Sequence, residues 1–244
     1  MTVFFALCFT VSAVNIISIL YSSYCAEKMY DEVAFSAVVL SSDETVPAAP
    51  NAEAFPISVD FDSLASVSDE IVGWLYSPKT PINYPVMQTS NNQKYLSRLP
   101  DGSDNKAGSI FADCRNGAFG SDSNYIIYGH NMKNDAMFGT LTEYRLQSYY
   151  DAHPVLYYST PAGNYEIEAA AGFVCDAESD IYRINQSSEH MSDFMVYAKS
   201  QSDFVSRAEY TAGDKTVTLS TCLTGNSDDT RRYVLIGIVK EITD

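Results

Sequence analysis

A cysteine, an arginine and a histidine have types and settings that could support nucleophilic catalysis. Cys222 ends the β-branched run at 217–221, and Arg232 opens the next apolar run after a polar stretch over 223–230. This pattern is typical of a strand, a loop and a second strand. If the two strands pair, the thiol and the guanidinium face one cleft, and only a base is lacking. The best candidate for that base is His130, in Tyr128-Gly129-His130-Asn131-Met132.

The bulk composition bounds the class of protein. The 244 residues are enough for one good-sized domain with an appendage, and the high tyrosine content fits a packed, β-rich core. The net charge of −16 argues against nucleic acid or anionic lipid as a partner, because a phosphate-binding surface needs lysine and arginine.

No cofactor or metal site is expected. The five cysteines are scattered and include no C-x-x-C pair, so neither a zinc site nor a disulfide framework is indicated. We interpret Cys114 and Cys175 as small buried hydrophobes. His153 and His190 are interpreted as structural or exposed. The remaining acidic candidates follow no hard-cation pattern, and most of them are interpreted as loop charges: Asp113, Asp135, Asp176 and Asp180.

The N-terminal segment predicts a membrane anchor. Residues 2–26 contain no charged side chain, and such a length can cross the roughly 30 Å hydrocarbon core as a helix. A cleaved signal peptide or a lipoprotein signal fits less well, because no basic region precedes the apolar run and a bulky Tyr24 precedes Cys25. We therefore expect a single-pass anchor over 1–26 with an extracytoplasmic catalytic domain.

The remaining chain predicts a spacer and one β-rich domain. Residues 27–60 are rich in Ala, Ser, Val and Pro and are interpreted as a semi-extended extracytoplasmic spacer, so the domain is expected over 61–244. Helices are expected at 63–75, 136–144 and 189–207. Strands are expected at 82–88, 108–113, 124–128, 155–160, 165–174, 217–222 and 232–241. The sum is a mainly antiparallel barrel or sandwich with helices inserted in its loops.

The motifs resemble the class B sortases. The likeness covers about residues 61–240 and is carried by five ordered groups of segments, which include Asn91-Asn92-Gln93-Lys94-Tyr95-Leu96, Gly108-Ser109-Ile110-Phe111-Ala112-Asp113, Tyr128-Gly129-His130-Asn131-Met132 and Thr218-Leu219-Ser220-Thr221-Cys222. The resemblance implies a closed β-barrel of about eight strands, with N-terminal helices and a helix in the loop between the sixth and seventh strands, here about 176–215. It also implies a membrane-anchored transpeptidase of Gram-positive bacteria.

The resemblance further implies partners and residue roles. Such enzymes cleave surface proteins in a C-terminal sorting signal, after the threonine of an N-P-x-T type motif, and pass the acyl group to a peptidoglycan amine. Cys222 matches the nucleophile, His130 the general acid/base and Arg232 the transition-state arginine. Arg231 is interpreted as a surface charge, because neighbours on a strand point to opposite faces. Four further residues match or adjoin the substrate groove: Asn92, Tyr128, Ser220 and Thr221.

Three alternatives stay open. One is a cysteine peptidase that hydrolyses its substrate, and another is a pilin-polymerising sortase whose acceptor is a lysine. Cys222, His130 and Arg232 do not decide between these acceptors. The third is a non-catalytic surface-binding domain on the same scaffold, against which the intact three residues argue.

Overall fold

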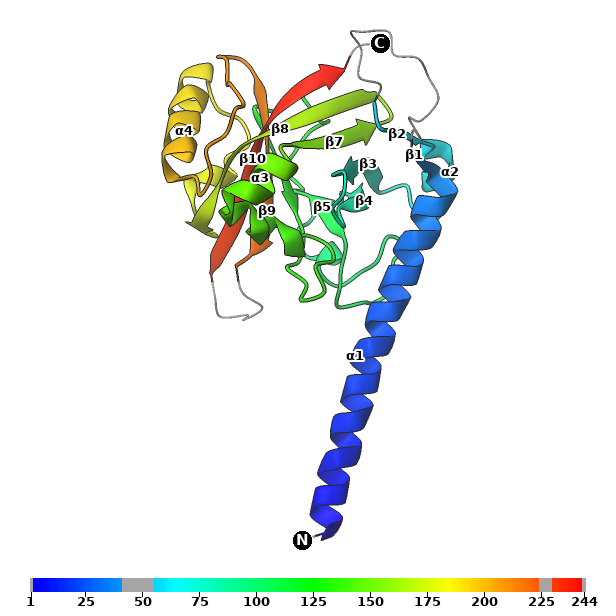
Figure 1. The fold of residues 1–244 in the computed structure, drawn as a ribbon. Helices are drawn as coiled ribbons and strands as arrows, with labels where there is room; N and C mark the ends of the chain where they lie inside the picture. Colours follow the sequence, from blue (N-terminus) through cyan, green and yellow to red (C-terminus); the bar gives the residue numbers. More distant parts are fainter. Residues whose placement is uncertain (1, 41–54, 224–229, 243–244) are drawn as a thin grey trace.

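The protein consists of one long N-terminal helix and a closed β-barrel (Figure 1). A computed structural model describes residues 2–40, 55–223 and 230–242. Helix α1 (Thr2–Ala37) runs from the N-terminus to the barrel and packs on its side with its C-terminal half. The strands β1 (Val38–Leu40) and β2 (Ile57–Val59) form a small separate sheet beside the end of α1.

The barrel closes through eight strands in the order β10-β8-β7-β3-β4-β5-β6-β9. Two of its pairings are parallel, β4 with β5 and β6 with β9, and the others are antiparallel. The strands are β3 (Ile71–Tyr76), β4 (Asn83–Met87), β5 (Ile110–Ala112), β6 (Asn124–Tyr128), β7 (Val155–Thr160), β8 (Gly163–Asp176), β9 (Lys215–Cys222) and β10 (Arg231–Ile242). The sequence-based expectation of a closed β-barrel is confirmed.

Short helices fill the connections between the strands. They are α2 (Phe61–Val67), η1 (Lys94–Leu96), η2 (Gly139–Arg145), α3 (Gln147–Ala152), η3 (Asp180–Tyr182) and α4 (Ser188–Gln201). Helix α4 lies in the long β8–β9 connection, as expected, and begins at the N-cap Ser187, whose hydroxyl accepts the His190 N–H. Its buried residues Met191, Met195 and Ala198 recur at helical spacing, and Met195 and Ala198 pack on the barrel wall.

Apolar side chains fill the barrel interior because successive residues of a strand alternate between its two faces. The interior cluster includes Leu75, Val86, Ile110, Ile127 and Leu219, all of them fully buried or nearly so. A second cluster lies between the outer face of β8 and β10 and helix α4. The barrel wall beside α4 is therefore buried on both faces.

The helix expected at 63–75 is wrong in its second half. Helix α2 ends at Val67, the C-cap Ser68 has an extended backbone, and the chain continues as strand β3. The apolar spacing resembled a helix because β3 is covered on both sides, so Trp74 and Leu75 are both completely buried. The Trp74 indole N–H donates to Asn83 Oδ1 at 2.7 Å on the neighbouring strand β4.

The other two expected helices are shorter than the pattern indicated. The segment expected at 136–144 is the 3₁₀ helix η2, which begins only at Gly139, because Met137 has a left-handed backbone with φ 57°. Helix α4 ends at Gln201, and the Ser202 hydroxyl accepts the Phe204 N–H in a turn that leaves the helix.

The structure departs from the expected spacer over 27–60. Helix α1 continues without a break to Ala37, and it packs on the barrel through Ala26, Tyr30 and Val33. The Tyr30 hydroxyl donates to the Gly108 carbonyl at 2.6 Å, and Asn105 bonds both the carbonyl and the hydroxyl of Ser22. The proline-rich centre of the expected spacer lies outside the described residues.

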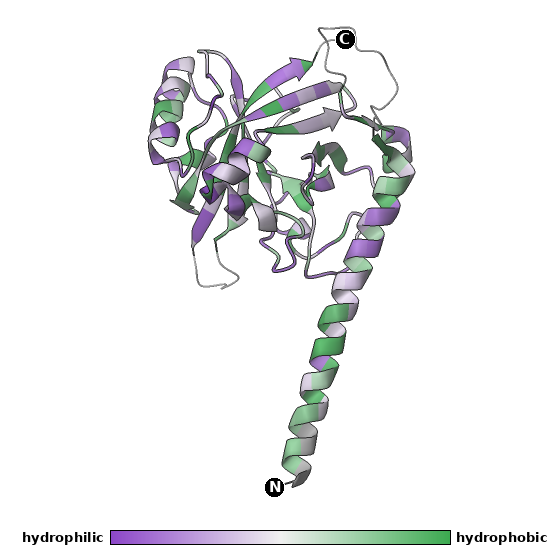
Figure 2. Cartoon of the chain, viewed as in Figure 1, coloured by the Kyte–Doolittle hydropathy of each residue, from purple (hydrophilic) through white to green (hydrophobic). Residues whose placement is uncertain are grey.

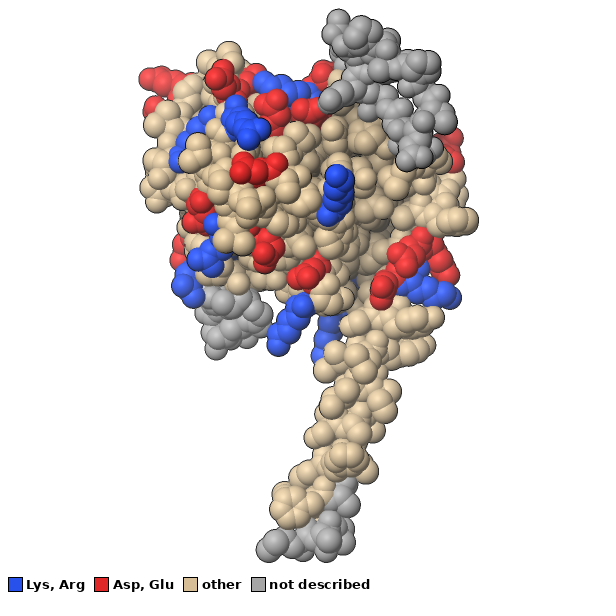
Figure 3. All heavy atoms as spheres, viewed as in Figure 1, with Lys and Arg blue, Asp and Glu red and all other residues tan. Residues whose placement is uncertain are grey.

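The part of α1 that extends away from the barrel is apolar. Figure 2 shows mostly hydrophobic residues along it, and Figure 3 shows the charged side chains gathered on the barrel and on the upper part of the helix. The segment Cys8–Ala37 contains a stretch long and apolar enough to cross a membrane. This property is shared by membrane anchors and signal sequences.

Candidate active site

Pairing of β9 with β10 brings Cys222 and Arg232 together. The two residues are direct cross-strand partners at the open end of this pair. Side chains of directly opposed residues lie on the same face of a sheet. Arg231 is exposed and pairs with Asp176 on β8 instead. The structure thus places Arg232, and not Arg231, beside Cys222.

His130 reaches the same place through the parallel pairing of β6 with β9. Tyr128 at the end of β6 is opposite Ser220, and the chain continues alongside β9. The Gly129 N–H donates to the Ser220 carbonyl at 3.1 Å, and Thr221 Oγ1 donates to the Gly129 carbonyl at 2.8 Å. These two bonds hold the residue before His130 next to the residue before Cys222.

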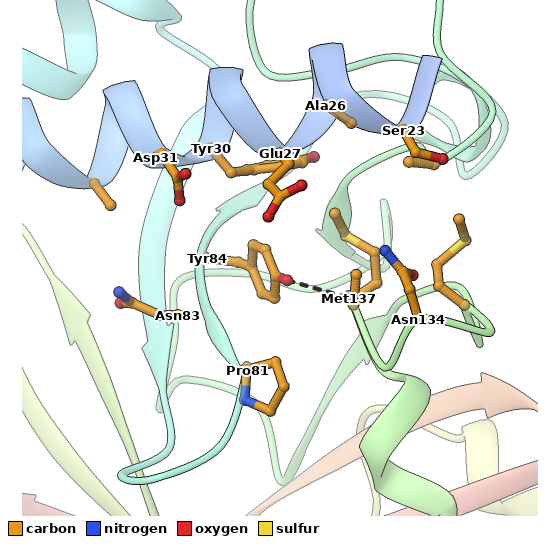
Figure 4. A pocket seen from close by; sticks show the side chains of 14 residues that line it. Ser23, Ala26, Glu27, Tyr30, Asp31, Pro81, Asn83, Tyr84, Asn134 and Met137 are labelled. Carbon is orange, nitrogen blue, oxygen red and sulfur yellow. Dashed lines mark hydrogen bonds between the residues drawn. The ribbon is translucent and has the colours of Figure 1, made fainter. Parts of the chain in front are cut away.

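Hydrogen bonds also hold the chain that follows His130. Asn131 Nδ2 donates to the Cys222 carbonyl at 2.9 Å, and the Phe138 N–H donates to the His130 carbonyl at 3.0 Å. Figure 4 shows the far side of this loop, where the Met137 N–H donates to the Tyr84 hydroxyl at 3.2 Å. The histidine therefore lies between two anchored segments.

The imidazole of His130 has a defined orientation. Its Nε2 lies 2.8 Å from the carbonyl oxygen of Leu96. Because a carbonyl oxygen can only accept, Nε2 must carry a proton. In the neutral ring Nδ1 is then the nitrogen that can take up a proton and return it.

These residues line one cleft of about 270 Å³. All seven residues singled out from the sequence are in its lining: Asn92, Tyr128, His130, Ser220, Thr221, Cys222 and Arg232. Sequence reasoning missed four more lining residues with side chains, namely Leu96, Phe111, Ala177 and Tyr182. Tyr182 comes from η3 in the β8–β9 connection, and its hydroxyl lies 2.9 Å from Ser220 Oγ. Only the fold brings Tyr182 to this wall.

Two tyrosines form an aromatic wall of the cleft. The rings of Tyr128 and Tyr182 stack with their centroids 6.2 Å apart. Burial raises the pKa of both phenols above its ordinary value, and the charge of Asp113 acts in the same direction on Tyr128. Both hydroxyls therefore stay protonated near neutral pH.

Two interpretations of single residues were wrong. Asp113 is not a solvated loop charge, because its side chain is completely buried and paired with Arg115. Cys114 is partly exposed rather than a buried hydrophobe, and its backbone N–H donates to Asn92 Oδ1 at 2.7 Å. Cys175 is half-buried beside the cluster under α4, and burial raises the pKa of its thiol.

The other histidines lie outside the cleft lining. His153 Nδ1 lies 3.2 Å from the Pro78 carbonyl, and His190 Nδ1 lies 2.8 Å from Ser187 Oγ at the start of α4. Among the residues that the structure describes, no three His, Cys, Asp or Glu side chains gather as metal ligands would.

Comparison with known proteins identifies the family. A family model described as Sortase domain matches residues 75–239. Sortase B of Listeria monocytogenes is 37% identical over 177 residues, which is 71% of either chain. The crystal structure of sortase B from Bacillus anthracis in complex with AAEK1 superposes with a TM-score of 0.76 and 28% identity, over 92% of this chain and 100% of that chain.

A Staphylococcus aureus sortase B–substrate complex superposes with a TM-score of 0.71 and 29% identity, over 75% of this chain and 85% of that chain. The chain therefore belongs to the sortase family of cysteine transpeptidases. Within that family its relatives named above are sortase B enzymes, as the motifs indicated.

Proposed function

We propose that this sortase cleaves surface proteins within a C-terminal sorting signal of the N-P-x-T type, after the threonine, and joins the acyl group to a peptidoglycan amine. The observation that carries the proposal is the convergence of Cys222, His130 and Arg232 on one cleft from three strand ends. The similarity to a sortase B–substrate complex supports a peptide as the occupant of that cleft.

In the first half-reaction the Cys222 thiolate attacks the threonine carbonyl carbon. The Arg232 guanidinium stabilises the oxyanion that forms, because it is permanently charged and offers several donors. The C–N bond then breaks, and His130 gives its Nδ1 proton to the departing amine. The product is a thioester on Cys222 and a neutral His130.

In the second half-reaction the acceptor amine attacks the thioester carbonyl. His130 accepts the proton that the amine loses, and the C–S bond breaks to release the thiolate and the new amide. Nitrogen is a better nucleophile than water toward a thioester, so a bound amine directs the acyl group to transfer rather than to hydrolysis.

The substrate backbone and side chains would be held by the polar and aromatic lining. Asn92 and Tyr128 both line the cleft, and Ser220 shares the strand of the nucleophile. Thr221 donates its hydroxyl to Gly129 and so acts on the cleft chiefly by fixing the segment before His130.

The chain belongs to a family associated with the cell surface, and we propose that α1 anchors it in the membrane by a single pass. In this proposal the span expected at 1–26 anchors the chain, the bilayer ends near Ser22, where Asn105 first holds the helix, and the catalytic domain, 61–244, lies outside the cell. Cell fractionation should find the intact chain in the membrane. A soluble secreted form that begins near residue 27 would contradict the anchor.

A mass-resolved peptide assay tests the proposed chemistry. Full-length protein in detergent is incubated with a panel of sorting-signal peptides, with and without candidate amines. We expect an acyl-enzyme and an amide product, both lost in Cys222→Ala and kept in Cys25→Ala, whose thiol lies on α1. Peptide cleavage by Cys222→Ala would refute the assignment of the nucleophile.

The arginine assignment has its own matched control. Arg232→Ala should lose about 100-fold or more in kcat/KM, as other removed oxyanion donors do, whereas Arg231→Ala should stay close to wild type. Equal losses would contradict the choice of strand face. In the same assay, product hydrolysed at every amine concentration would favour a peptidase, a lysine-containing acceptor alone would favour a pilin polymerase, and no acyl-enzyme would favour a binding domain.

A further inference from the structure

A charged pair lies in the turn that follows β5, behind the cleft wall. The Asp113 side chain is completely buried, and it accepts hydrogen bonds from the Arg115 Nε and Nη2 at 2.8 Å each. The Arg115 backbone N–H and the Tyr128 hydroxyl also donate to it, both at 2.9 Å. A bidentate arginine with two further donors satisfies a buried carboxylate almost fully.

The same turn contacts several residues that line the cleft. The N–H of Cys114, between the paired residues, donates to the side chain of Asn92. Asp113 accepts from the hydroxyl of Tyr128, and Arg115 Nη2 donates to the Tyr182 carbonyl at 3.3 Å. Tyr182 stacks on Tyr128 and bonds Ser220 on β9. The side chains of Asn92 and Tyr128 are thus bonded to this turn directly, and Tyr182 is bonded to it through its backbone carbonyl.

We propose that Asp113 and Arg115 are positioning residues, which fix the shape of the substrate groove by holding Asn92, Tyr128 and Tyr182 at fixed places. The proposal rests on the proposed function, because it takes this cleft as the peptide site. The Arg115 bond to the Tyr182 carbonyl is then one of the contacts that join the β8–β9 connection to the β5–β6 side of the barrel, beside the Asn124 side-chain bonds to the Ile181 and Arg183 carbonyls.

The charge states suit this role. Burial alone would raise the pKa of Asp113, but the Arg115 side chain, its backbone N–H and the Tyr128 hydroxyl hold that pKa below its usual value. Asp113 is thus a carboxylate and Tyr128 a protonated donor over the whole neutral range. The bond between them keeps the Tyr128 ring at one angle toward the cleft.

Neither member of the pair lines the cleft, and the reacting groups are held by other contacts. Cys222 is fixed by its pairing with β10, and His130 by the Leu96 carbonyl and the Phe138 N–H. Loss of the pair should therefore weaken peptide binding and leave the thiol reactive. A defect in KM rather than kcat separates positioning of the groove from damage to the chemistry.

The principal test compares Arg115→Met with Arg183→Met in the full chain. Arg183 forms an exposed pair with Asp180 in the neighbouring η3 segment, so it matches Arg115 in charge and location without reaching Asp113. We expect Arg115→Met to raise the peptide KM about tenfold, the usual effect of a lost charged hydrogen bond, with kcat within about threefold. Arg183→Met should keep the wild-type KM, and Arg115→Lys should recover part of the loss.

A second variant covers the case in which Arg115→Met unfolds. Tyr128→Phe keeps the ion pair and removes only the hydroxyl that binds Asp113, and it should raise KM severalfold. The fold-increase in KM of the double variant Arg115→Met/Tyr128→Phe should be smaller than the product of the two single fold-increases, because both changes act on the position of the Tyr128 ring. Equal KM values for Arg115→Met and Arg183→Met would overturn the proposal.

The rate at which iodoacetamide alkylates Cys222 completes the test. Because this small reagent needs the thiol and not the groove, its rate should be unchanged in Arg115→Met. A slower alkylation together with a lower kcat would overturn the positioning role. Failure of the proposed function itself is distinguishable, since it would show as peptide cleavage by Cys222→Ala, whatever the KM of the Arg115 variants.

Discussion

Gly108 gives the sharpest test of how the histidine is oriented. Its backbone is left-handed, with φ 60°, and a Cβ atom added there would lie 2.5 Å from the Tyr95 carbonyl oxygen and 2.9 Å from that of Leu96. It would also lie 3.1 Å from Cδ2 of His130. The Leu96 carbonyl is the acceptor that fixes His130 Nε2. Gly108→Ala should therefore disturb stability and catalysis together.

The magnitude follows from two contributions. A left-handed backbone costs a residue with a Cβ about 1–2 kcal/mol, and forcing an extra methyl group into a packed site costs a further 1–3 kcal/mol or so. Gly102→Ala is the matched control, because Gly102 has φ 82° and open space around its added Cβ. It should therefore show the first contribution alone.

Thermal unfolding of the full chain in detergent and peptide kinetics give the readouts. For a domain of this size each kcal/mol corresponds to about 2–4 °C in Tm. We expect a loss of about 2–5 kcal/mol for Gly108→Ala and about 1–2 kcal/mol for Gly102→Ala. A displaced imidazole should also cost Gly108→Ala about 100-fold in kcat/KM, with Gly102→Ala near wild type. Equal stability and activity for the two variants would refute the steric reasoning.

Two further predictions concern the ion pair and the docked helix. The folded pKa of Asp113 lies below its usual value of 3.8, so its carboxylate favours the folded state above that value, and the contribution is lost as the pH falls through the folded pKa. The Tm advantage of wild type over Asp113→Asn should therefore shrink between about pH 7 and about pH 3, and a constant difference would contradict it. Tyr30→Phe should destabilise the chain by about 1–3 kcal/mol, because it leaves the Gly108 carbonyl without its buried donor. Tyr24→Phe, on an exposed part of the same helix, should be neutral, and equal Tm losses would argue against docking.

The β-strands could be predicted because their signal is local. β-branched and aromatic runs bounded by turn residues located seven of the eight barrel strands, and the expected range for β6 matches the observed one. The juxtaposition of Cys222 and Arg232 follows from simple strand pairing. The approach of His130 depends on a parallel pairing between the distant strands β6 and β9, which no local pattern predicts. The family resemblance supplied the role of His130 and not this pairing.

Two other elements, β3 and the C-terminal half of α1, were predicted incorrectly because another sequence pattern outweighed the correct one. The stretch around Trp74 has helical spacing but forms β3, because a strand that is covered on both faces does not alternate. The C-terminal half of α1 did carry a signal: Ala26, Tyr30, Val33 and Ala37 recur at helical spacing, and all are buried. Its Ala- and Ser-rich composition favoured a spacer instead.

The buried state of Asp113 was beyond sequence reasoning. An aspartate at the end of a strand, followed by polar residues, is most often solvated. Its pairing with Arg115, two residues on, requires that the turn fold back beneath Tyr128, and only the closed barrel brings that tyrosine there. The same holds for Tyr182, which the long β8–β9 connection returns to the cleft.

The docking of α1 has a consequence for how substrates are found. Between Thr2 and Ser22, where Asn105 first holds the helix, an α-helix rises about 30 Å, which is the thickness of the hydrocarbon core. With α1 across the bilayer as proposed, no flexible linker separates the span from the docked part of the helix. The barrel is therefore held at a fixed height above the membrane. Figure 1 shows the end of β9 and the start of β10 on the side of the barrel toward which α1 descends. If the proposed surface-protein substrate is also held in the membrane, the two proteins meet by diffusion in the plane of the membrane. The cleavage site of that substrate can then reach the cleft only if it lies at the same height above the membrane.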